Sequence, residues 1–134
     1  MSLEAVQSAI DDALRADTAA GGVAALVGGR VYEDAAPDDA PLPLVRHAVV
    51  TNPAVFSLQA DRLEIEFQVD TYAERFDRAA ARAVAGAVDA LLHRGSLSVA
   101  GFSGGQVLRT DAGVPSTEDE LCRVRQRFRL FANQ

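Results

Sequence analysis

The chain has 134 residues and a formal net charge of −6; hydrophobic residues make up 49% of it and charged residues 24%. This length predicts a single domain over residues 1–134 with one hydrophobic core, and the composition is that of a globular protein. The acidic balance argues against a free-standing nucleic-acid-binding module, because such binding depends on cations that displace counterions from phosphates.

The use of lysine and cysteine limits the chemistry further. All 13 basic residues are arginine, so lysine nucleophiles, Schiff-base lysines and P-loop lysines are excluded. The one cysteine, Cys122, has no partner within the chain for a disulfide or a thiolate metal cluster. The N-terminal residues lack a signal-peptide pattern, and no apolar stretch reaches the roughly 20 residues of a membrane helix. We therefore expect a soluble protein that is made in the cytoplasm and has no membrane contact.

The first half of the chain predicts one helix followed by short strands. Apolar residues recur at helical spacing over residues 3–16. Residues 19–27 form either a second short helix or a packed loop, which the glycine pair at 28–29 ends. Three strands and one acidic, proline-containing loop follow: a strand at 30–32, the loop at 33–43, and strands at 44–50 and 56–58.

The clearest helix is predicted over residues 71–92. Thr71 and Glu74 have the spacing of a capping box, and an apolar stripe runs from Phe76 to Leu92. Gly95 is expected to end this helix.

Alternation of apolar and polar residues predicts strands on both sides of that helix. The pattern is clearest over residues 63–69, where a half-buried strand is expected. The last third predicts three more strands and one polar loop: strands at 97–102, 106–110 and 121–131, and the loop at 111–119. This element order favours an α+β fold, with a mostly antiparallel sheet and two main helices packed on one face.

Four arginines on one face of the last strand are the most specific local feature. They are Arg123, Arg125, Arg127 and Arg129. Like charges in such a row repel one another unless something negative lies opposite. Three interpretations are open: acidic residues of a neighbouring strand, an acidic surface of another subunit, or a nucleic acid, which the net charge disfavours. The acidic candidates within the chain are Glu64, Glu66 and Asp70.

No catalytic or cofactor-binding pattern emerges. His47 and His93 have no second histidine or cysteine at metal-ligand spacing, and a position near a helix C-terminus suffices to explain His93. The acidic pairs Asp11–Asp12 and Asp38–Asp39 are expected to be solvated. The letters G-x-S-x-G occur around Ser103, but a β segment follows where a nucleophile elbow needs a helix. We expect no enzyme activity, no cofactor and no metal.

Four features in a fixed order carry a family resemblance. They are the N-terminal helix, Val27-Gly28-Gly29-Arg30-Val31-Tyr32 with an acidic stretch ending in Ala40-Pro41-Leu42-Pro43-Leu44-Val45, an alternating strand running into a helix over residues 63–92, and a closing hairpin with Arg127-Phe128-Arg129. This arrangement resembles the small tail-completion, or tail-terminator, proteins of long-tailed phages and prophages.

The resemblance implies a structural role in a virion. Such proteins form a hexameric ring in the neck that caps the tail tube, ends its polymerisation and provides the surface joining tail to head; they are assembled in the host cytoplasm. The implied partners are further copies of the chain, the tail tube protein and the head–tail connector or stopper, while DNA passes through the channel without sequence-specific binding. In this setting the arginines of the last strand, with Glu64, Glu66 and Asp70, are expected at a subunit or tube interface. The loops at 33–39 and 110–118 are expected to reach the tube or the connector.

Two classes of alternative remain. A head-closure or stopper protein of the same particle is one, although stoppers tend to be more barrel-like and the long helix at 71–92 favours the terminator. A small dimeric binding module is the other, and it would form pairs rather than sixfold rings. A small-molecule enzyme needs convergent polar groups in a pocket, which the sequence does not supply.

Overall fold

The computed structural model describes residues 3–50, 57–59, 62–118 and 120–133. Three helices lie within these residues: α1 (Leu3–Ala16), α2 (Val23–Val27) and α3 (Arg78–Leu92). The same residues form seven strands: β1 (Val31–Glu33), β2 (Leu44–Val50), β3 (Ser57–Gln59), β4 (Arg62–Glu74), β5 (Ser103–Asp111), β6 (Ser116–Glu118) and β7 (Leu121–Asn133). Phe56, predicted to begin a strand, lies outside the described residues.

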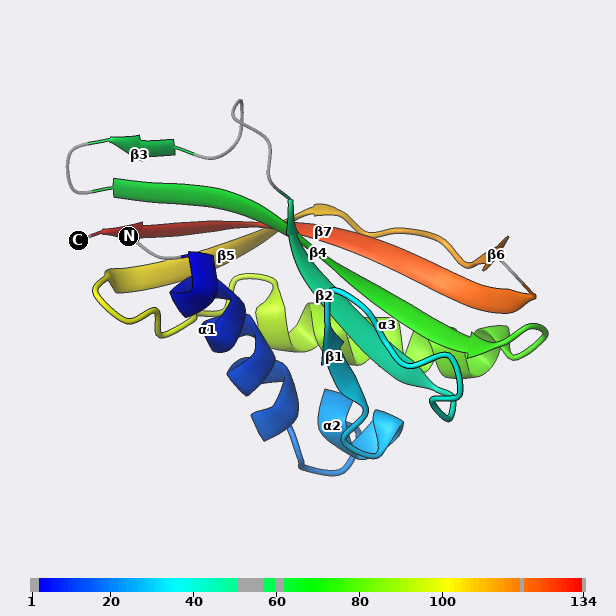
Figure 1. The fold of residues 1–134 in the computed structure, drawn as a ribbon. Helices are drawn as coiled ribbons and strands as arrows, with labels where there is room; N and C mark the ends of the chain where they lie inside the picture. Colours follow the sequence, from blue (N-terminus) through cyan, green and yellow to red (C-terminus); the bar gives the residue numbers. More distant parts are fainter. Residues whose placement is uncertain (1–2, 51–56, 60–61, 119, 134) are drawn as a thin grey trace.

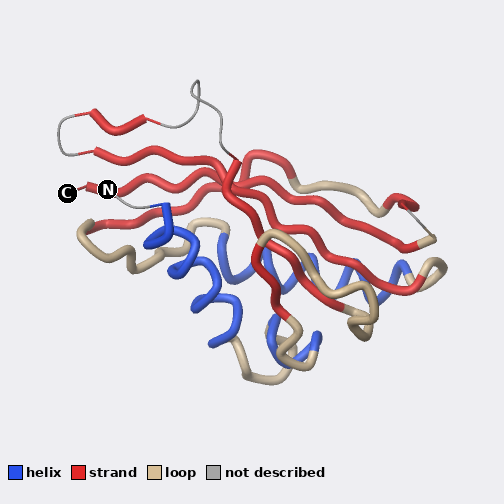
Figure 2. The backbone as a smooth tube through the Cα atoms, viewed as in Figure 1, coloured by secondary structure: helices blue, strands red, loops and turns tan. Residues whose placement is uncertain are grey.

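One sheet contains all seven strands, and the helices lie on one of its faces (Figures 1 and 2). The main strand order is β1-β2-β4-β7-β5; β3 pairs with the first part of β4, and β6 pairs with the first part of β7. Every pairing is antiparallel except β1 with β2. The predicted α+β class, with a mostly antiparallel sheet covered on one face, is confirmed.

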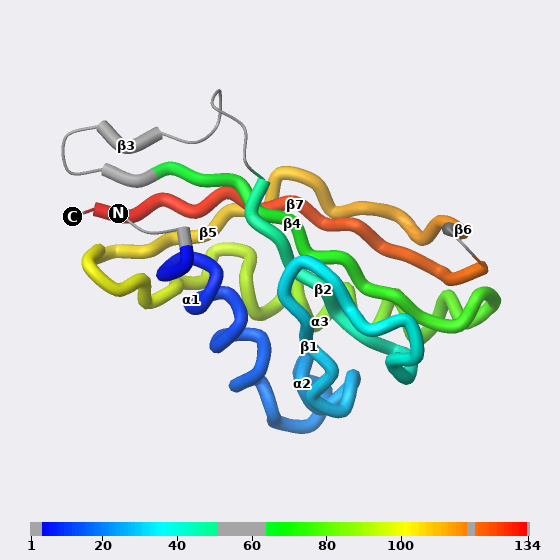
Figure 3. The backbone as a smooth tube through the Cα atoms, viewed as in Figure 1, coloured from blue at the N-terminus to red at the C-terminus, as the bar shows by residue number. Residues whose placement is uncertain are grey.

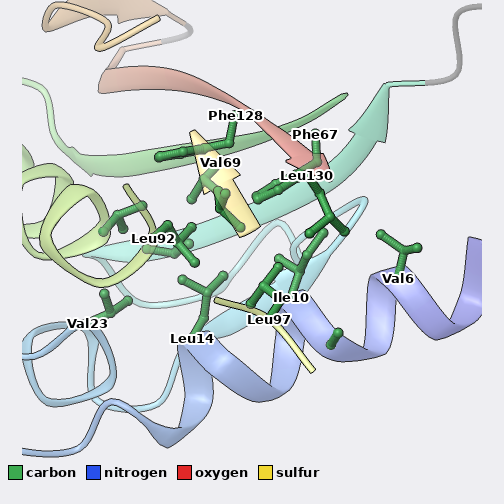
Figure 4. Close-up of a cluster of buried hydrophobic side chains, with 14 of the residues drawn as sticks. Val6, Ile10, Leu14, Val23, Phe67, Val69, Leu92, Leu97, Phe128 and Leu130 are labelled. Carbon is green, nitrogen blue, oxygen red and sulfur yellow. The ribbon is translucent and has the colours of Figure 1, made fainter. Parts of the chain in front are cut away.

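The centre of the sheet joins segments far apart in the sequence. β4 lies between β2 and β7, and all 13 of its residues pair with residues of β7 (Figure 3). Phe67 and Phe128 face each other in this register, and their rings stack with centroids 5.5 Å apart. Ile10 of α1 and Leu92 of α3 belong to the same buried cluster (Figure 4). The core therefore fills the space between the sheet and the helices, where each fully buried large side chain contributes about 1.5–3 kcal/mol.

The predicted start of the long helix is wrong. β4 continues to Glu74, so that Thr71 is a buried strand residue and not a helix cap. The helix begins at Arg78, where the side chain of Asp77 accepts a hydrogen bond from the Ala80 amide at 3.1 Å. The ladder with β7 supplies partners for the backbone up to Glu74, and this long-range pairing overrides the local capping pattern.

The apolar stripe of α3 also differs from the prediction. Phe76 is 88% exposed in the turn before the helix. The buried residues of α3 are Ala81, Val84, Ala85, Val88 and Leu92. This helix face turns towards the sheet, which leaves the predicted Ala79 and Ala83 exposed. The helix ends at Leu92, and Gly95 follows in the turn, where a Cβ would lie 2.5 Å from the Leu91 carbonyl oxygen.

The strand predicted over residues 97–102 is wrong. That segment contains no strand, and Leu97 and Val99 reach the core from irregular backbone. β5 instead begins at Ser103 and runs through both glycines. Gly105 is required there because a Cβ at this position would lie 2.1 Å from the Leu97 carbonyl oxygen. The loop predicted at 111–119 contains the short strand β6, which pairs with the start of β7.

Candidate interaction surface

The four arginines of β7 lie on the face of the sheet opposite the helices, here called the outer face. The alternate side chains of β7 point into the core, and all are buried: Cys122, Val124, Gln126, Phe128, Leu130 and Ala132. Because strand side chains alternate between faces, the arginines must share the other face. The predicted alternation of this strand is therefore confirmed along its whole length.

The register of β4 against β7 places polar residues opposite these arginines. The pairs are Glu66 with Arg129, Gln68 with Arg127, Asp70 with Arg125, and Tyr72 with Arg123. The Asp70 carboxylate accepts hydrogen bonds from Arg125 Nε at 2.8 Å and from Nη2 at 3.2 Å. Arg129 Nη1 lies 3.5 Å from Glu64 Oε1 in a diagonal contact. Neutralisation by a neighbouring strand, the first of the three interpretations, thus holds for Arg125 and Arg129.

Asp70 also accepts a hydrogen bond from a third strand, β2. Arg46 of β2 lies opposite Asp70, and its Nη2 donates to Asp70 Oδ2 at 2.7 Å. Asp70 is completely buried although it points to the outer face, because two guanidinium groups cover it. Burial alone lowers the pKa of Arg46, but the hydrogen bond to Asp70 outweighs it and the pKa lies above its ordinary value. The Arg46 guanidinium also lies over the Tyr72 ring, 5.4 Å from its centroid.

Positive charge predominates over this central part of the outer face. Five arginines lie there, namely Arg46, Arg123, Arg125, Arg127 and Arg129. The carboxylates among residues 64–72 of β4 are Glu64, Glu66 and Asp70. Arg127 is exposed and lies between the neutral Gln68 of β4 and Asp111 of β5. With Asp111 of β5, which pairs with Arg127, four carboxylates meet five arginines here, so this part of a protein whose net charge is −6 carries a small excess of positive charge.

The edge of the sheet at β5 is covered by the chain that follows α3. Three backbone hydrogen bonds join them: Arg94 N to Val107 O at 2.8 Å, Val107 N to Gly95 O at 3.0 Å, and Leu97 N to Gly105 O at 2.7 Å. These groups are unavailable to an added strand. Contact with another molecule at this part of the sheet therefore has to use side chains on a face.

His47 and Asp11 form a contact that the sequence did not indicate. His47 points from β2 towards α1, and its Nε2 lies 2.8 Å from Asp11 Oδ1. Asp11 also accepts a hydrogen bond from Arg15 Nε at 2.6 Å, so the prediction that it is merely solvated is wrong. Burial raises the pKa of Asp11, but the hydrogen bonds to His47 and Arg15 outweigh this effect, and the pKa lies below its ordinary value. The contact fastens α1 to the sheet.

The remaining polar candidates have structural partners. His93 Nδ1 accepts a hydrogen bond from the Arg109 amide at 3.0 Å, and Arg109 Nη1 lies 2.8 Å from Asp89 Oδ1. Ser103 lies at the start of β5, where its hydroxyl donates to the Asn133 carbonyl at 3.3 Å. Cys122 is buried and is not part of a disulfide.

The described part of the chain contains neither a metal-binding cluster nor a membrane-spanning helix. None of its groups of histidine, cysteine, aspartate and glutamate has three members placed to hold a metal ion. None of its helices combines the length and the apolar character needed to cross a membrane.

Comparison with known proteins gives one family match and several solved chains with a similar fold. The family model described as "Tail completion protein gp17" matches residues 8–132. A solved chain from a structure described as "Virion of native gene transfer agent (GTA) particle" superposes with a TM-score of 0.72 at 24% identity, covering 98% of this chain and 97% of that chain. A second solved chain gives a TM-score of 0.66 at 19% identity, covering 100% of this chain and 96% of that one. No curated protein sequence matches significantly. At these identities the two structures establish a shared fold.

Proposed function

The chain belongs to the tail completion protein gp17 family, and on that premise we propose that it is a ring subunit that caps a phage-type tail tube. The observation that carries this proposal is the extent of the family match, which leaves out only seven residues at one end and two at the other. The fold shared with a chain of a gene transfer agent virion supports the same setting. The whole chain, residues 1–134, then acts as one structural unit in the neck of a virion.

The ring contains six copies, joins tail to head, and ends polymerisation of the tube. Its partners are other copies of the chain, the tail tube protein and a connector or stopper. The role is structural, with no catalysis and no cofactor. Since every copy carries −6, the ring is strongly acidic overall, which suits a channel that DNA crosses without binding.

The outer face is the proposed contact surface. Its exposed cationic member, Arg127, and the partly exposed pair Arg129 and Glu64 are available to a partner without disturbing the core. Asp70 and Arg125 instead hold the strands together beneath that surface. We assign subunit or tube contacts to this face, together with the loops at 33–39 and 110–118, since the backbone of β5 at Gly105 and Val107 is already paired within the chain.

Tube elongation tests the proposal. Purified tail tube protein is polymerised with and without the chain, and tube lengths are measured by electron microscopy. The proposal expects the chain to stop elongation and to appear as added density at one tube end. Tubes that elongate equally in its presence would contradict capping. A head-closure protein would leave elongation unchanged yet bind the connector, and a dimeric binding module would bind neither.

A further inference from the structure

One aromatic side chain stands apart from the core. Phe76 lies in the turn between β4 and α3 and is 88% exposed, whereas Phe67 and Phe128 are fully buried. The Arg75 guanidinium lies over its ring, 5.2 Å from the centroid. The turn therefore presents an apolar knob that carries a positive charge.

A hollow lies on the sheet near the other end of β7, where two large apolar side chains stand among polar neighbours. Its volume is about 440 Å³, and it is lined by Gly104, Gln106, Leu108, Phe131, Ala132 and Asn133. Leu108 is 40% exposed there. Gly104, which has no side chain, forms part of the lining and leaves that side of the hollow open. An aromatic side chain placed in this hollow would contact Leu108 and the half-buried Phe131.

Arg75 beside the knob and Glu64 beside the hollow have opposite charges. Glu64 lies opposite Phe131 in the register of β4 and β7, and its side chain is 33% exposed. Its contact within the chain, to Arg129 Nη1, is long at 3.5 Å. Arg75 accompanies Phe76, so docking of the knob would bring a cation to this carboxylate.

The two features lie at opposite ends of the sheet. The turn with Phe76 follows Glu74, which pairs with Leu121 at the start of β7, and Phe131 lies ten residues further along that strand, about 33 Å away. Figure 1 shows this turn at one end of the sheet and the start of β5 at the other. Two different surfaces that fit each other build a head-to-tail contact, and such contacts close into rings or extend as filaments.

We propose that the Arg75–Phe76 knob of one copy docks in the Leu108–Phe131 hollow of the next copy. The occupant is a second copy because the chain supplies both halves of the contact: an exposed aromatic ring with its cation, and a hollow with two apolar side chains beside a carboxylate. This inference rests on the ring of the proposed function and names the surface through which it closes.

Disulfide trapping tests the contact. Phe76→Cys and Leu108→Cys are placed on separate chains, which are mixed under assembling conditions, with tube tips present, and oxidised. The expected result is a disulfide between the two variants in the mixture and in neither variant alone, while the native Cys122 stays buried. A chain with both substitutions should give a ladder of covalent species that ends at the closed ring.

The matched control uses a different hollow. Leu42 lines a hollow with Leu44 and Tyr72 near the end of the sheet where Phe76 lies. Mixing Phe76→Cys with Leu42→Cys should give no disulfide. A cross-link to position 42 in place of 108, or rings without any cross-link to position 108, would overturn the proposed contact.

A charge exchange gives an independent test. Arg75→Glu and Glu64→Arg should each weaken assembly, and the two together in one chain should restore it. Phe76→Ser should raise the concentration for half-assembly about tenfold or more, with an unchanged thermal midpoint because the side chain is exposed. If wild-type rings form and Phe76→Ser assembles equally well, the contact is wrong but the ring stands. If the wild type forms no ring even on tubes, the proposed function itself fails.

Discussion

Asp70 on β4 lies opposite Arg125 on β7, and its two carboxylate oxygens accept hydrogen bonds from the Nε and Nη2 atoms of that arginine at 2.8 and 3.2 Å. The same carboxylate accepts a third hydrogen bond, from Arg46 on β2. One buried carboxylate therefore links three strands, and it stabilises the neighbouring guanidinium groups of Arg46 and Arg125 on the outer face.

Removing the charge of Asp70 should destabilise the fold. Asp70→Asn leaves the guanidinium groups of Arg46 and Arg125 facing each other over a neutral amide, and we expect a loss of about 2 kcal/mol or more in the free energy of unfolding. Urea denaturation measures this. Glu66→Gln on the same strand face is the control and should cost less than about 1 kcal/mol. Equal losses in both variants would remove the special role of Asp70.

Arg127 should matter for assembly and not for folding. It is exposed and lies between Gln68 and Asp111, where a surface ion pair adds little, so Arg127→Ala should change the free energy of unfolding by less than about 0.5 kcal/mol. If the outer face contacts a partner, the same variant should assemble or bind tubes more weakly, as measured by sedimentation. Arg82→Ala, an exposed arginine on α3, is the control that should assemble normally. Normal assembly of both variants would exclude Arg127 from the contact surface.

Two substitutions test where α3 begins: one at the observed cap, Asp77, and one at Glu74 of the predicted capping box. Asp77→Ala removes the hydrogen bond to the Ala80 amide and should cost about 1 kcal/mol. Glu74→Ala, at the position that the local sequence pattern assigns to a capping box, should cost less than about 0.5 kcal/mol because Glu74 is an exposed strand residue. Thermal unfolding of the two variants decides between them, and the reverse order of stabilities would refute the observed helix start.

Asp11 should make stability depend on pH in the acid range. Its folded pKa lies below the unfolded value, so the unfolded chain takes up the proton first as the pH falls. The stabilisation is fully present above the unfolded pKa of about 4 and is lost as the pH falls through the folded pKa. The advantage of the wild type over Asp11→Asn in the free energy of unfolding should therefore shrink between pH 6 and pH 2.5. A constant difference over this range would contradict the assignment.

The faces of β4 and β7 were predictable from the sequence, while several element boundaries were not. The two-residue period of β7 places the arginines on one side and Phe128 and Leu130 on the other, because burial selects the apolar face. The end of β4 depends instead on residues about 50 positions later, since β7 supplies the partners that keep Thr71 to Glu74 extended. A local capping pattern contains no information about a partner so far along the chain.

Contacts between helices and strands were not predictable from the sequence either. The hydrogen bond between His47 and Asp11 arises because α1 packs against β2, which no spacing along the chain encodes. The backbone of Leu97 and Val99 was also not predictable. These residues alternate as in a strand, but their backbone is irregular. Their burial indicates core residues, and burial alone does not require a ladder partner. By contrast, the acidic residues opposite the arginines were correctly named as candidates, because a row of like charges needs an opposing sign.

The oligomeric mass of the purified protein tests the central proposal most directly. Native mass spectrometry over a concentration series, with and without purified tail tubes, reports the number of copies in the particle. The account predicts a species of six times the 14.2 kDa chain mass, either free or recovered from tube ends. A stable dimer that persists at all concentrations and ignores tail tubes would contradict it.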